Sequence, residues 1–297
     1  MVGVPLVAAA VCPHPPMIVP ELAVSASGEL DDLRLACAGA VDRLLATRPD
    51  LVIVVGAGER TVRHGPGDAG SFRPYGLDRV LRLGPDGTRT GRADLHPELE
   101  GNDLELPLSL LIGAWLLDRA GATGPRRGQS VATDTPADEC RRIGAELVAD
   151  PAGRIALLVM GDGSACRGPR APGYDDPHAQ PYDDRVAAAL RDADGSALLG
   201  LEPELSTRLL VAGRASWQVL AGATARSGGS WHGDLSYYAA PYGVSYFVAT
   251  WTPSRPTGSP GSGGAHRPPR SAEPHRPPRS AEPKRPPRSG APDGAPV

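Results

Sequence analysis

A histidine held between prolines is the residue of this chain best placed to do chemistry. His14 stands in the run Cys12-Pro13-His14-Pro15-Pro16, directly after the apolar stretch Val4 to Val11. Proline fixes its own backbone and holds the residue before it in an extended conformation, so the backbone of His14 is constrained on both sides. An imidazole at the end of a buried strand can bind a metal or accept a proton. His14 is therefore a candidate metal ligand and a candidate general base; the alternative is a rigid turn that carries a surface histidine.

An acidic and a hydroxyl side chain follow a second apolar run. Ile155 to Met160 has the length and composition of a buried strand, and Asp162 and Ser164 come directly after it. Because the carboxyl ends of neighbouring parallel strands meet at one edge of a sheet, we expect both residues to lie on the same rim as His14. Asp162 is then the nearest group able to orient the imidazole, which makes it a second catalytic candidate.

Five short motifs occur in a fixed order between about residues 4 and 251. They are Pro13 to Glu21 (PHPPMIVPE), Arg48 to Val55 (RPDLVIVV), Met160 to Ser164 (MGDGS), Ala171 to Asp175 (APGYD) and Tyr238 to Tyr246 (YAAPYGVSY). Together they resemble the class III extradiol ring-cleavage dioxygenases, the family of the catalytic β subunit of protocatechuate-cleaving enzymes. The resemblance implies one domain of that fold over residues 1–252.

The resemblance also implies an Fe(II) centre made of two histidines and one glutamate, with a further histidine as acid/base on a catechol. Three ligands on one face leave positions open for substrate and dioxygen. His14 matches the first ligand, but the other three positions hold Gly58, Ala165 and Arg214. Glycine and alanine offer no donor, and a protonated guanidinium repels a divalent cation. We therefore expect no cofactor, and Fe(II) only if the family mechanism survives through other ligands.

The leading hypothesis is a binding or regulatory module, or a protein of altered chemistry, with a vacated iron site. Its pocket rim is expected to comprise Gly58, Glu59, Asp162, Ser164 and Arg214 beside His14. Another hypothesis is that the protein is the non-catalytic subunit of a homo- or hetero-oligomer and contacts its partner through the apolar run Leu106 to Leu117.

The alternative from the enzyme class is an active non-heme Fe(II) dioxygenase that cleaves a catecholic substrate through displaced ligands. Glu59, His64 and His178 are the candidates for such ligands. His64 stands in a run of glycine and proline, residues 63–67, which is typical of a mobile loop. Ordinary loop histidines are the simpler interpretation.

Arg214 stands at the position of the family's glutamate, and two interpretations of its role are open. Its guanidinium can bind a carboxylate or phosphate through paired hydrogen bonds, with Gly56-Ala57-Gly58 leaving room for the ligand. It can instead pair with Asp162 or Glu59 and fill the cavity. The first reading predicts a small anionic or aromatic molecule as the partner.

Composition separates a globular part from a tail near Thr252. The tail, residues 253–297, carries a repeated HRPPRSAEP unit and is expected to be disordered. Its seven arginines, one lysine and three acids give +5, so the globular part carries −8 of the total of −3. An acidic domain with a short basic tail does not indicate a nucleic-acid binder. Four scattered cysteines and the lack of a long apolar segment favour a cytoplasmic protein that does not enter a membrane.

Strand-like and helix-like runs alternate along the chain, which predicts an α/β fold with a mostly parallel or mixed central sheet flanked by helices. The predicted strands are residues 4–11, 51–55 and 155–160, followed by a terminal hairpin over 235–251. Helices are predicted over 29–48, 106–120, 136–149 (with Thr135 as its cap) and 183–193, with two short ones within 199–223. Residues 56–78 are expected to form a long connection.

Overall fold

The computed structural model describes residues 6–23, 27–84, 105–149 and 153–254. Contacts divide the chain into two units, Met1–Arg255 and Pro256–Val297, and every described residue belongs to the first. Apart from Pro253 and Ser254, the predicted tail lies outside the described residues.

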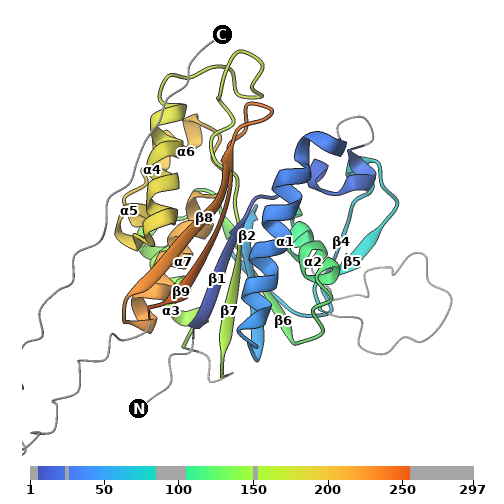
Figure 1. The fold of residues 1–297 in the computed structure, drawn as a ribbon, viewed down its shortest axis with the longest axis vertical. Coiled ribbons are helices and arrows are strands. Elements are labelled where there is room, and N and C mark those ends of the chain that lie inside the picture. Colours follow the sequence, from blue (N-terminus) through green and yellow to red (C-terminus); the bar gives the residue numbers. More distant parts are fainter. Residues whose placement is uncertain (1–5, 24–26, 85–104, 150–152, 255–297) are drawn as a thin grey trace, which may run out of the picture. The chain divides into compact units, whose positions relative to one another are not determined.

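A seven-stranded sheet forms the centre of the first unit, in the spatial order β3-β6-β2-β7-β1-β9-β8 (Figure 1). The four strands β6, β2, β7 and β1 are parallel, whereas β3, β9 and β8 pair antiparallel with their neighbours. The strands span β1 (Leu6–Cys12), β2 (Leu51–Gly58), β3 (Val62–His64), β6 (Arg126–Ala132), β7 (Ile155–Met160), β8 (Trp231–Ala239) and β9 (Tyr246–Pro253). A separate two-stranded sheet pairs β4 (Ala69–Ser71) with β5 (Val80–Arg82). The predicted α/β fold with a mixed central sheet is confirmed.

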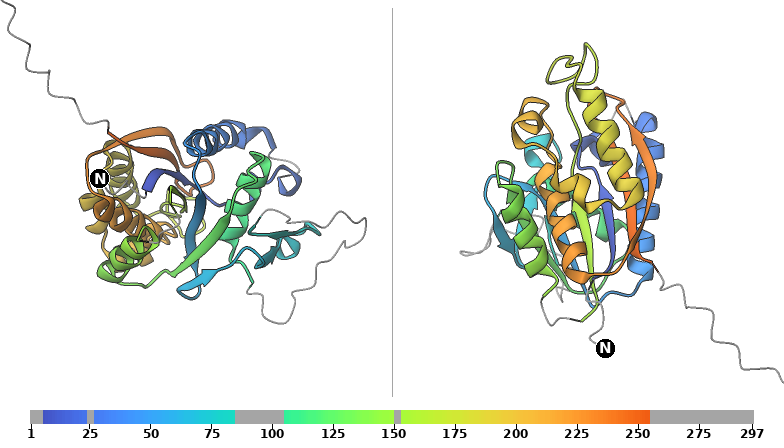
Figure 2. Two further views of the ribbon diagram at one scale, coloured as in Figure 1. Left: turned by 90° about the horizontal axis from the view of Figure 1, so that it is seen from below. Right: turned by 90° about the vertical axis from the view of Figure 1, so that its left-hand side faces the viewer.

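Helices cover both faces of this sheet (Figure 2). One face is covered by α1 (Asp31–Ala46) and α2 (Leu108–Arg119). The other face is covered by α3 (Ala137–Leu147), α4 (Ala179–Asp192), α5 (Gly195–Leu199), α6 (Pro203–Arg208) and α7 (Arg214–Ser227). Short 3-10 helices span Pro16–Ile18, Pro20–Leu22, Ser27–Leu30 and Arg73–Tyr75.

The double cover explains why the central strands are apolar at every position. In β1, Ala10 and Cys12 pack in the α1/α2 core, whereas Ala9 and Val11 pack in the core on the α3/α7 side. Successive side chains of a strand point to opposite faces, so a strand that is buried on both faces has apolar side chains on both. Each fully buried Val or Leu contributes about 1.5–3 kcal/mol, which makes these strands the rigid base of the site.

Most predicted elements are confirmed within a few residues at each end. Helix α2 is buried along nearly its whole length, as its composition predicts. Thr135 is not the cap of α3, because the helix follows Pro136 and has no side-chain cap. The Thr135 hydroxyl instead lies 3.3 Å from that of Thr61.

Two regions differ from the prediction because polar sequences form buried strands there. The expected long connection, residues 56–78, contains the end of β2 and the strands β3 and β4. Strand β6 begins Arg126-Arg127 and lacks an apolar run, so it was not predicted. Its first side chain is nevertheless buried, where the Arg126 guanidinium contacts Asp118 at 2.5 Å.

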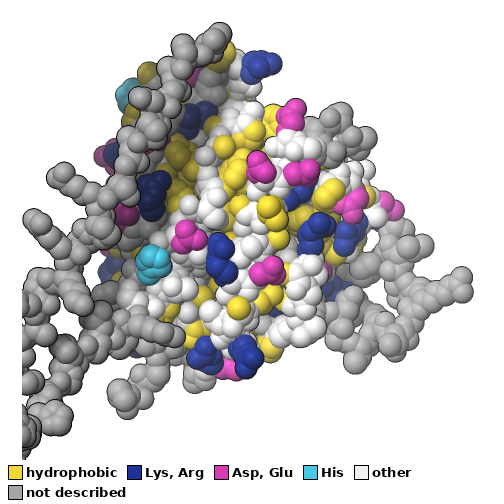
Figure 3. Space-filling view, in the orientation of Figure 1, with side chains coloured by type: hydrophobic (Ala, Val, Ile, Leu, Met, Phe, Trp, Pro, Cys, Tyr) yellow, Lys and Arg dark blue, Asp and Glu magenta, His cyan; other side chains and the backbone are white. Residues whose placement is uncertain are grey.

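The visible surface mixes charges of both signs. On the face shown in Figure 3, basic and acidic side chains are interspersed. Among the surface ion pairs, Arg43 and Asp234 join α1 to β8 at 3.6 Å. In the described ranges, no helix combines the length and apolar character needed to cross a bilayer.

Candidate functional site

The parallel strands bring the candidate residues to one edge of the sheet. His14 follows β1, Asp162 and Ser164 follow β7, and Gly58 ends β2. Since β1, β7 and β2 are neighbours and run in the same direction, their carboxyl ends lie side by side. This edge is where ligands of open α/β sheets bind.

His14 and Asp162 are in direct contact. The backbone N–H of His14 donates to Oδ1 of Asp162 at 2.8 Å, and the His14 Nδ1 atom lies 3.6 Å from the same oxygen. A second link holds the two strands together, because the Gly161 N–H donates to the Cys12 carbonyl at 2.9 Å. His14 is 7% exposed, and its Nδ1 has no hydrogen-bond partner among the described residues.

Burial sets the electrostatics of this pair. Loss of solvation raises the pKa of Asp162, while the nearby His14 imidazole and backbone N–H oppose the rise. Burial also raises the pKa of the Cys37 thiol, which contacts Cys12. Burial at this site therefore favours the uncharged forms of Asp162 and Cys37.

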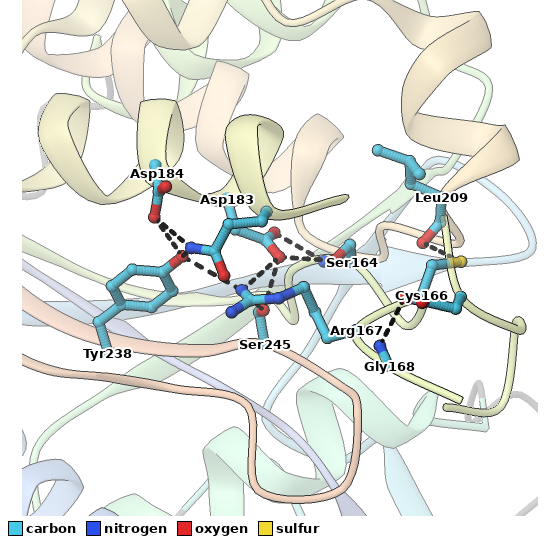
Figure 4. A network of polar contacts seen from close by, with 11 residues as sticks. Ser164, Cys166, Arg167, Gly168, Asp183, Asp184, Leu209, Tyr238 and Ser245 are labelled. Carbon is cyan, nitrogen blue, oxygen red and sulfur yellow. Dashed lines mark hydrogen bonds and ion pairs between the residues drawn. The ribbon is translucent and has the colours of Figure 1, made fainter. Parts of the chain in front are cut away.

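Ser164 belongs to a buried polar network around Asp183 (Figure 4). Its N–H donates to Oδ1 of Asp183 at 3.0 Å, and its hydroxyl donates to Oδ2 of the same carboxylate. The Ser245 hydroxyl and the Arg167 guanidinium also donate to Oδ2, at 2.6 and 3.2 Å. The network ties the loop after β7 to α4 and β9, so Ser164 positions this loop rather than lining a cavity.

Arg214 is buried in the packing of α7 and fully occupied. Its Nη1 donates to Oε1 of Gln218 at 2.8 Å, and its Nη2 donates to the carbonyl of Thr135 at 2.8 Å and to that of Thr133. Only 2% of the residue is exposed. The side chain fills space, as one reading predicted, but it uses neutral acceptors in place of Asp162 or Glu59.

A cavity of about 690 Å³ opens beside the carboxyl ends of β2 and β6. It is lined by Ala57 and Gly58 at the end of β2 and by Glu59 and Arg60, which follow this strand. Tyr75 and the start of α2 close other sides. The cavity does not include His14 or Asp162. The structure thus separates the predicted rim: Gly58 and Glu59 line the cavity, Asp162 lies with His14, and Ser164 and Arg214 are buried in the separate contacts described above.

The glycines of β2 serve packing, which corrects the expectation that they leave room for a ligand. A Cβ atom at Gly56 would lie 2.4 Å from the Ser109 hydroxyl oxygen. One at Gly58 would lie 2.8 Å from Cβ of Ser130 on β6. A side chain at either position would collide with a neighbour already in place.

His64 is part of a strand and not of a mobile loop. It ends β3, which pairs with β6 so that His64 lies opposite Gly128. The imidazole is 5% exposed and lies between two polar groups: Nδ1 is 3.1 Å from Oδ2 of Asp68, and Nε2 is 3.1 Å from Oγ of Ser130. Burial lowers the pKa of His64, against an opposing effect of Asp68. Sequence reasoning missed Ser130 and Asp68; the spacing His64-x3-Asp68 was the available signal.

The proposed displaced ligands do not converge. His64 is on β3 at one edge of the sheet, whereas His178 precedes α4, which packs against β8 at the opposite edge. The His178 side chain is 62% exposed, and its Nδ1 lies 2.8 Å from Oδ1 of Asp176. Glu59, His64 and His178 therefore cannot hold one metal ion in this structure.

The residues around His14 do not fit a three-ligand iron centre. In the part of the chain that the structure describes, Asp162 is the one carboxylate that contacts His14, and the positions of other implied ligands hold Gly58 and the occupied Arg214. Within the described ranges, no group of three histidine, cysteine or acidic side chains is placed to bind a metal.

Comparisons with known proteins give similarity to solved structures but to no family model or curated protein. The chain is similar to the crystal structure of the uncharacterized protein JW3007 from Escherichia coli K12, with 17% identity and a TM-score of 0.44 over 83% of this chain and 99% of that one. A similarity of this extent carries no information about activity.

Proposed function

We propose that this protein is an extradiol dioxygenase-like binding module that lacks the iron centre and binds a small aromatic acid in the cavity beside β2 and β6. The observation that carries the proposal is the lining of this cavity, which offers an arginine, an aromatic ring and leucine side chains in one space of about 690 Å³. Cavities of this size hold small organic ligands.

Arg60 supplies the anion-binding group. It is exposed, it lines the cavity, and no acidic side chain of the described ranges is paired with it. Its guanidinium can receive a carboxylate through two parallel hydrogen bonds. Arg60 thus takes the role that the sequence suggested for Arg214, whose donors are occupied.

Tyr75 and the leucines supply the surface for a ring. Tyr75 is 41% exposed, and Leu108 and Leu111 line the cavity from α2. Glu59 and Glu105 also line it and can accept hydrogen bonds from hydroxyl groups of the ligand. A hydroxylated aromatic acid matches all three kinds of group.

Calorimetry with 4-hydroxybenzoate tests the proposal, with Arg60→Gln as the variant and Arg63→Gln as its control. Arg63 is on β3, outside the cavity lining, and lies 3.7 Å from Glu146. A charged hydrogen bond contributes about 1.5–3 kcal/mol, so Arg60→Gln should weaken binding about tenfold or more and the control should not. Equal binding by the parent and Arg60→Gln contradicts the proposal, as does no binding by the parent.

Two further expectations belong to this proposal. Its cytosolic location is supported by four buried cysteines that form no disulfide. Assembly into an oligomer is tested by light scattering, although α2, the helix suggested as a contact, is buried within the unit.

A further inference from the structure

We propose that Ser130, His64 and Asp68 form a nucleophilic site at the wall of this cavity, which transfers the acyl group of small carboxylic esters to water. The inference rests on the proposed function only in using the same cavity as the binding space. It assigns to the cavity a reaction that no resemblance suggested.

The three side chains stand in the order that nucleophilic catalysis requires. The Ser130 Oγ lies 3.1 Å from Nε2 of His64, and Nδ1 of the same ring lies 3.1 Å from Oδ2 of Asp68. A hydroxyl, an imidazole that contacts it and a carboxylate behind the imidazole are the parts of a serine nucleophile with its base and its orienting acid. Ser130 and His64 both line the cavity.

The fold holds each member rigidly. Ser130 is on β6, between β2 and β3, and His64 is on β3. Asp68 is fixed by the turn after β3, because its Oδ2 accepts from the N–H of Gly65 at 3.2 Å while its own N–H donates to the Gly65 carbonyl. Gly58 leaves the space that the Ser130 side chain occupies.

The proton positions follow from these contacts. Asp68 accepts from Nδ1–H of His64, which leaves Nε2 as an acceptor that faces Ser130. The Ser130 hydroxyl has two other acceptors, the Arg60 carbonyl at 2.8 Å and the Val62 carbonyl at 3.3 Å. Rotation about the Cβ–Oγ bond turns the hydroxyl hydrogen from a backbone carbonyl toward Nε2 of His64, while the oxygen stays in place. Burial lowers the pKa of His64, which favours the neutral ring that can accept this proton.

The reaction balances with water as the only co-reactant. Ser130 Oγ bonds to the ester carbonyl carbon while its proton passes to Nε2, and the alcohol leaves with that proton as the carbon–oxygen bond breaks. Water, deprotonated by the same nitrogen, then releases the acid and restores the serine. Arg60 and the leucines of α2 favour esters of small acids with an apolar body.

Labelling with a fluorophosphonate probe, followed by peptide mapping, tests the assignment on the full chain. Attack by Ser130 displaces fluoride and leaves the phosphonyl group on Oγ. We expect the label on Ser130, and a fall in labelling rate of about 100-fold or more in His64→Gln, since general-base catalysis is worth 10²–10⁴. The matched control is Ser227→Ala, which removes a hydroxyl at the end of α7, outside the cavity lining, and should label like the parent.

Asp68 acts as a positioning residue, and a pH profile separates this role from a structural one. Because Asp68 raises the pKa of His64, Asp68→Asn should lower the apparent pKa of the labelling rate as well as the rate. A slower rate with an unchanged pKa would overturn the role of Asp68.

The map of the parent protein decides the proposal even if variants fail to fold. A folded parent with no label on Ser130, or a label that His64→Gln leaves unchanged, overturns it. Calorimetry with 4-hydroxybenzoate on the same preparation keeps the two proposals distinct. Binding without labelling refutes the reaction and supports the binding module, and labelling without binding does the reverse.

Discussion

Asp183 is the residue whose replacement tests the polar network behind the site most sharply. Its carboxylate is fully buried and accepts from the Ser164 N–H, the hydroxyls of Ser164 and Ser245, and the Arg167 guanidinium. In Asp183→Asn, the amide oxygen can keep the bond from the Ser164 N–H. The amide nitrogen then faces Arg167 with a donor in place of an acceptor, and the two hydroxyl bonds lose their charged acceptor.

The magnitude follows from the bonds that change. A hydrogen bond to a charged group contributes about 1.5–3 kcal/mol, and part of each hydroxyl bond survives by rotation, so the loss should be about 3 kcal/mol. For a domain of this size, about 1 kcal/mol shifts the Tm by 2–4 °C, which gives a fall of about 6–12 °C. Urea and thermal unfolding followed by circular dichroism measure both quantities.

Asp184→Asn is the matched control. Asp184 is the next residue, and its exposed carboxylate accepts from the Tyr238 hydroxyl at 2.8 Å. Its replacement should cost less than about 1 kcal/mol, because exposed polar pairs contribute little. If Asp183→Asn unfolds within about 1 kcal/mol of the parent, the network does not hold the loop after β7 and the reasoning is refuted.

Three further changes have expected results. Gly58→Ala places a Cβ 2.8 Å from that of Ser130. It should lower the free energy of unfolding by about 1–3 kcal/mol and reduce labelling of Ser130. If both values are unchanged, β6 moves to accommodate the new Cβ and the prediction is wrong. Arg214→Lys keeps the charge but not the fork that reaches Gln218 and two carbonyls, so chemical denaturation should show a loss of about 2–3 kcal/mol, and full stability would contradict the occupied role of Arg214. The raised folded-state pKa of Asp162 means that its contribution is present below the ordinary carboxyl value of about 4 and is lost as the pH rises through the folded pKa. The stability of the parent relative to Asp162→Asn should therefore fall as the pH rises above the ordinary carboxyl value, and a flat difference in urea titrations would be the contrary result.

Sequence patterns were sufficient for the central elements because these are covered on both faces. Strand β7 is buried at all six positions, so its apolar run was an unambiguous signal. The parallel arrangement then predicted the edge of the sheet at which Asp162, directly after this strand, lies. The contact of Asp162 with His14 could be predicted in the same way, since both residues follow neighbouring parallel strands.

The cavity could not be predicted from the sequence, because its walls are polar strands at the edge of the sheet. In β6, buried Gln129 and Ser130 are satisfied by β3, as where the Gln129 amide donates to the Val62 carbonyl at 3.2 Å. Such residues become strand-forming only when a partner accepts their hydrogen bonds, and that partner is far away in the sequence. Without β3 and β6, the sequence could not place His64 beside Ser130.

Tertiary packing also decided the role of Arg214. Its place in the chain identified a lost carboxylate but not the neighbours of the new side chain. The acceptors are two carbonyls of the segment before α3 and an amide one turn along α7. Backbone carbonyls leave no trace in side-chain patterns, so neither of the two readings included them.

The most direct test of the binding module is a crystal structure of the protein soaked anaerobically with Fe(II) and 4-hydroxybenzoate. We expect the aromatic acid in the cavity beside Arg60 and no iron at His14. Iron held at His14 by three side chains, with the acid bound to the metal, would contradict the account.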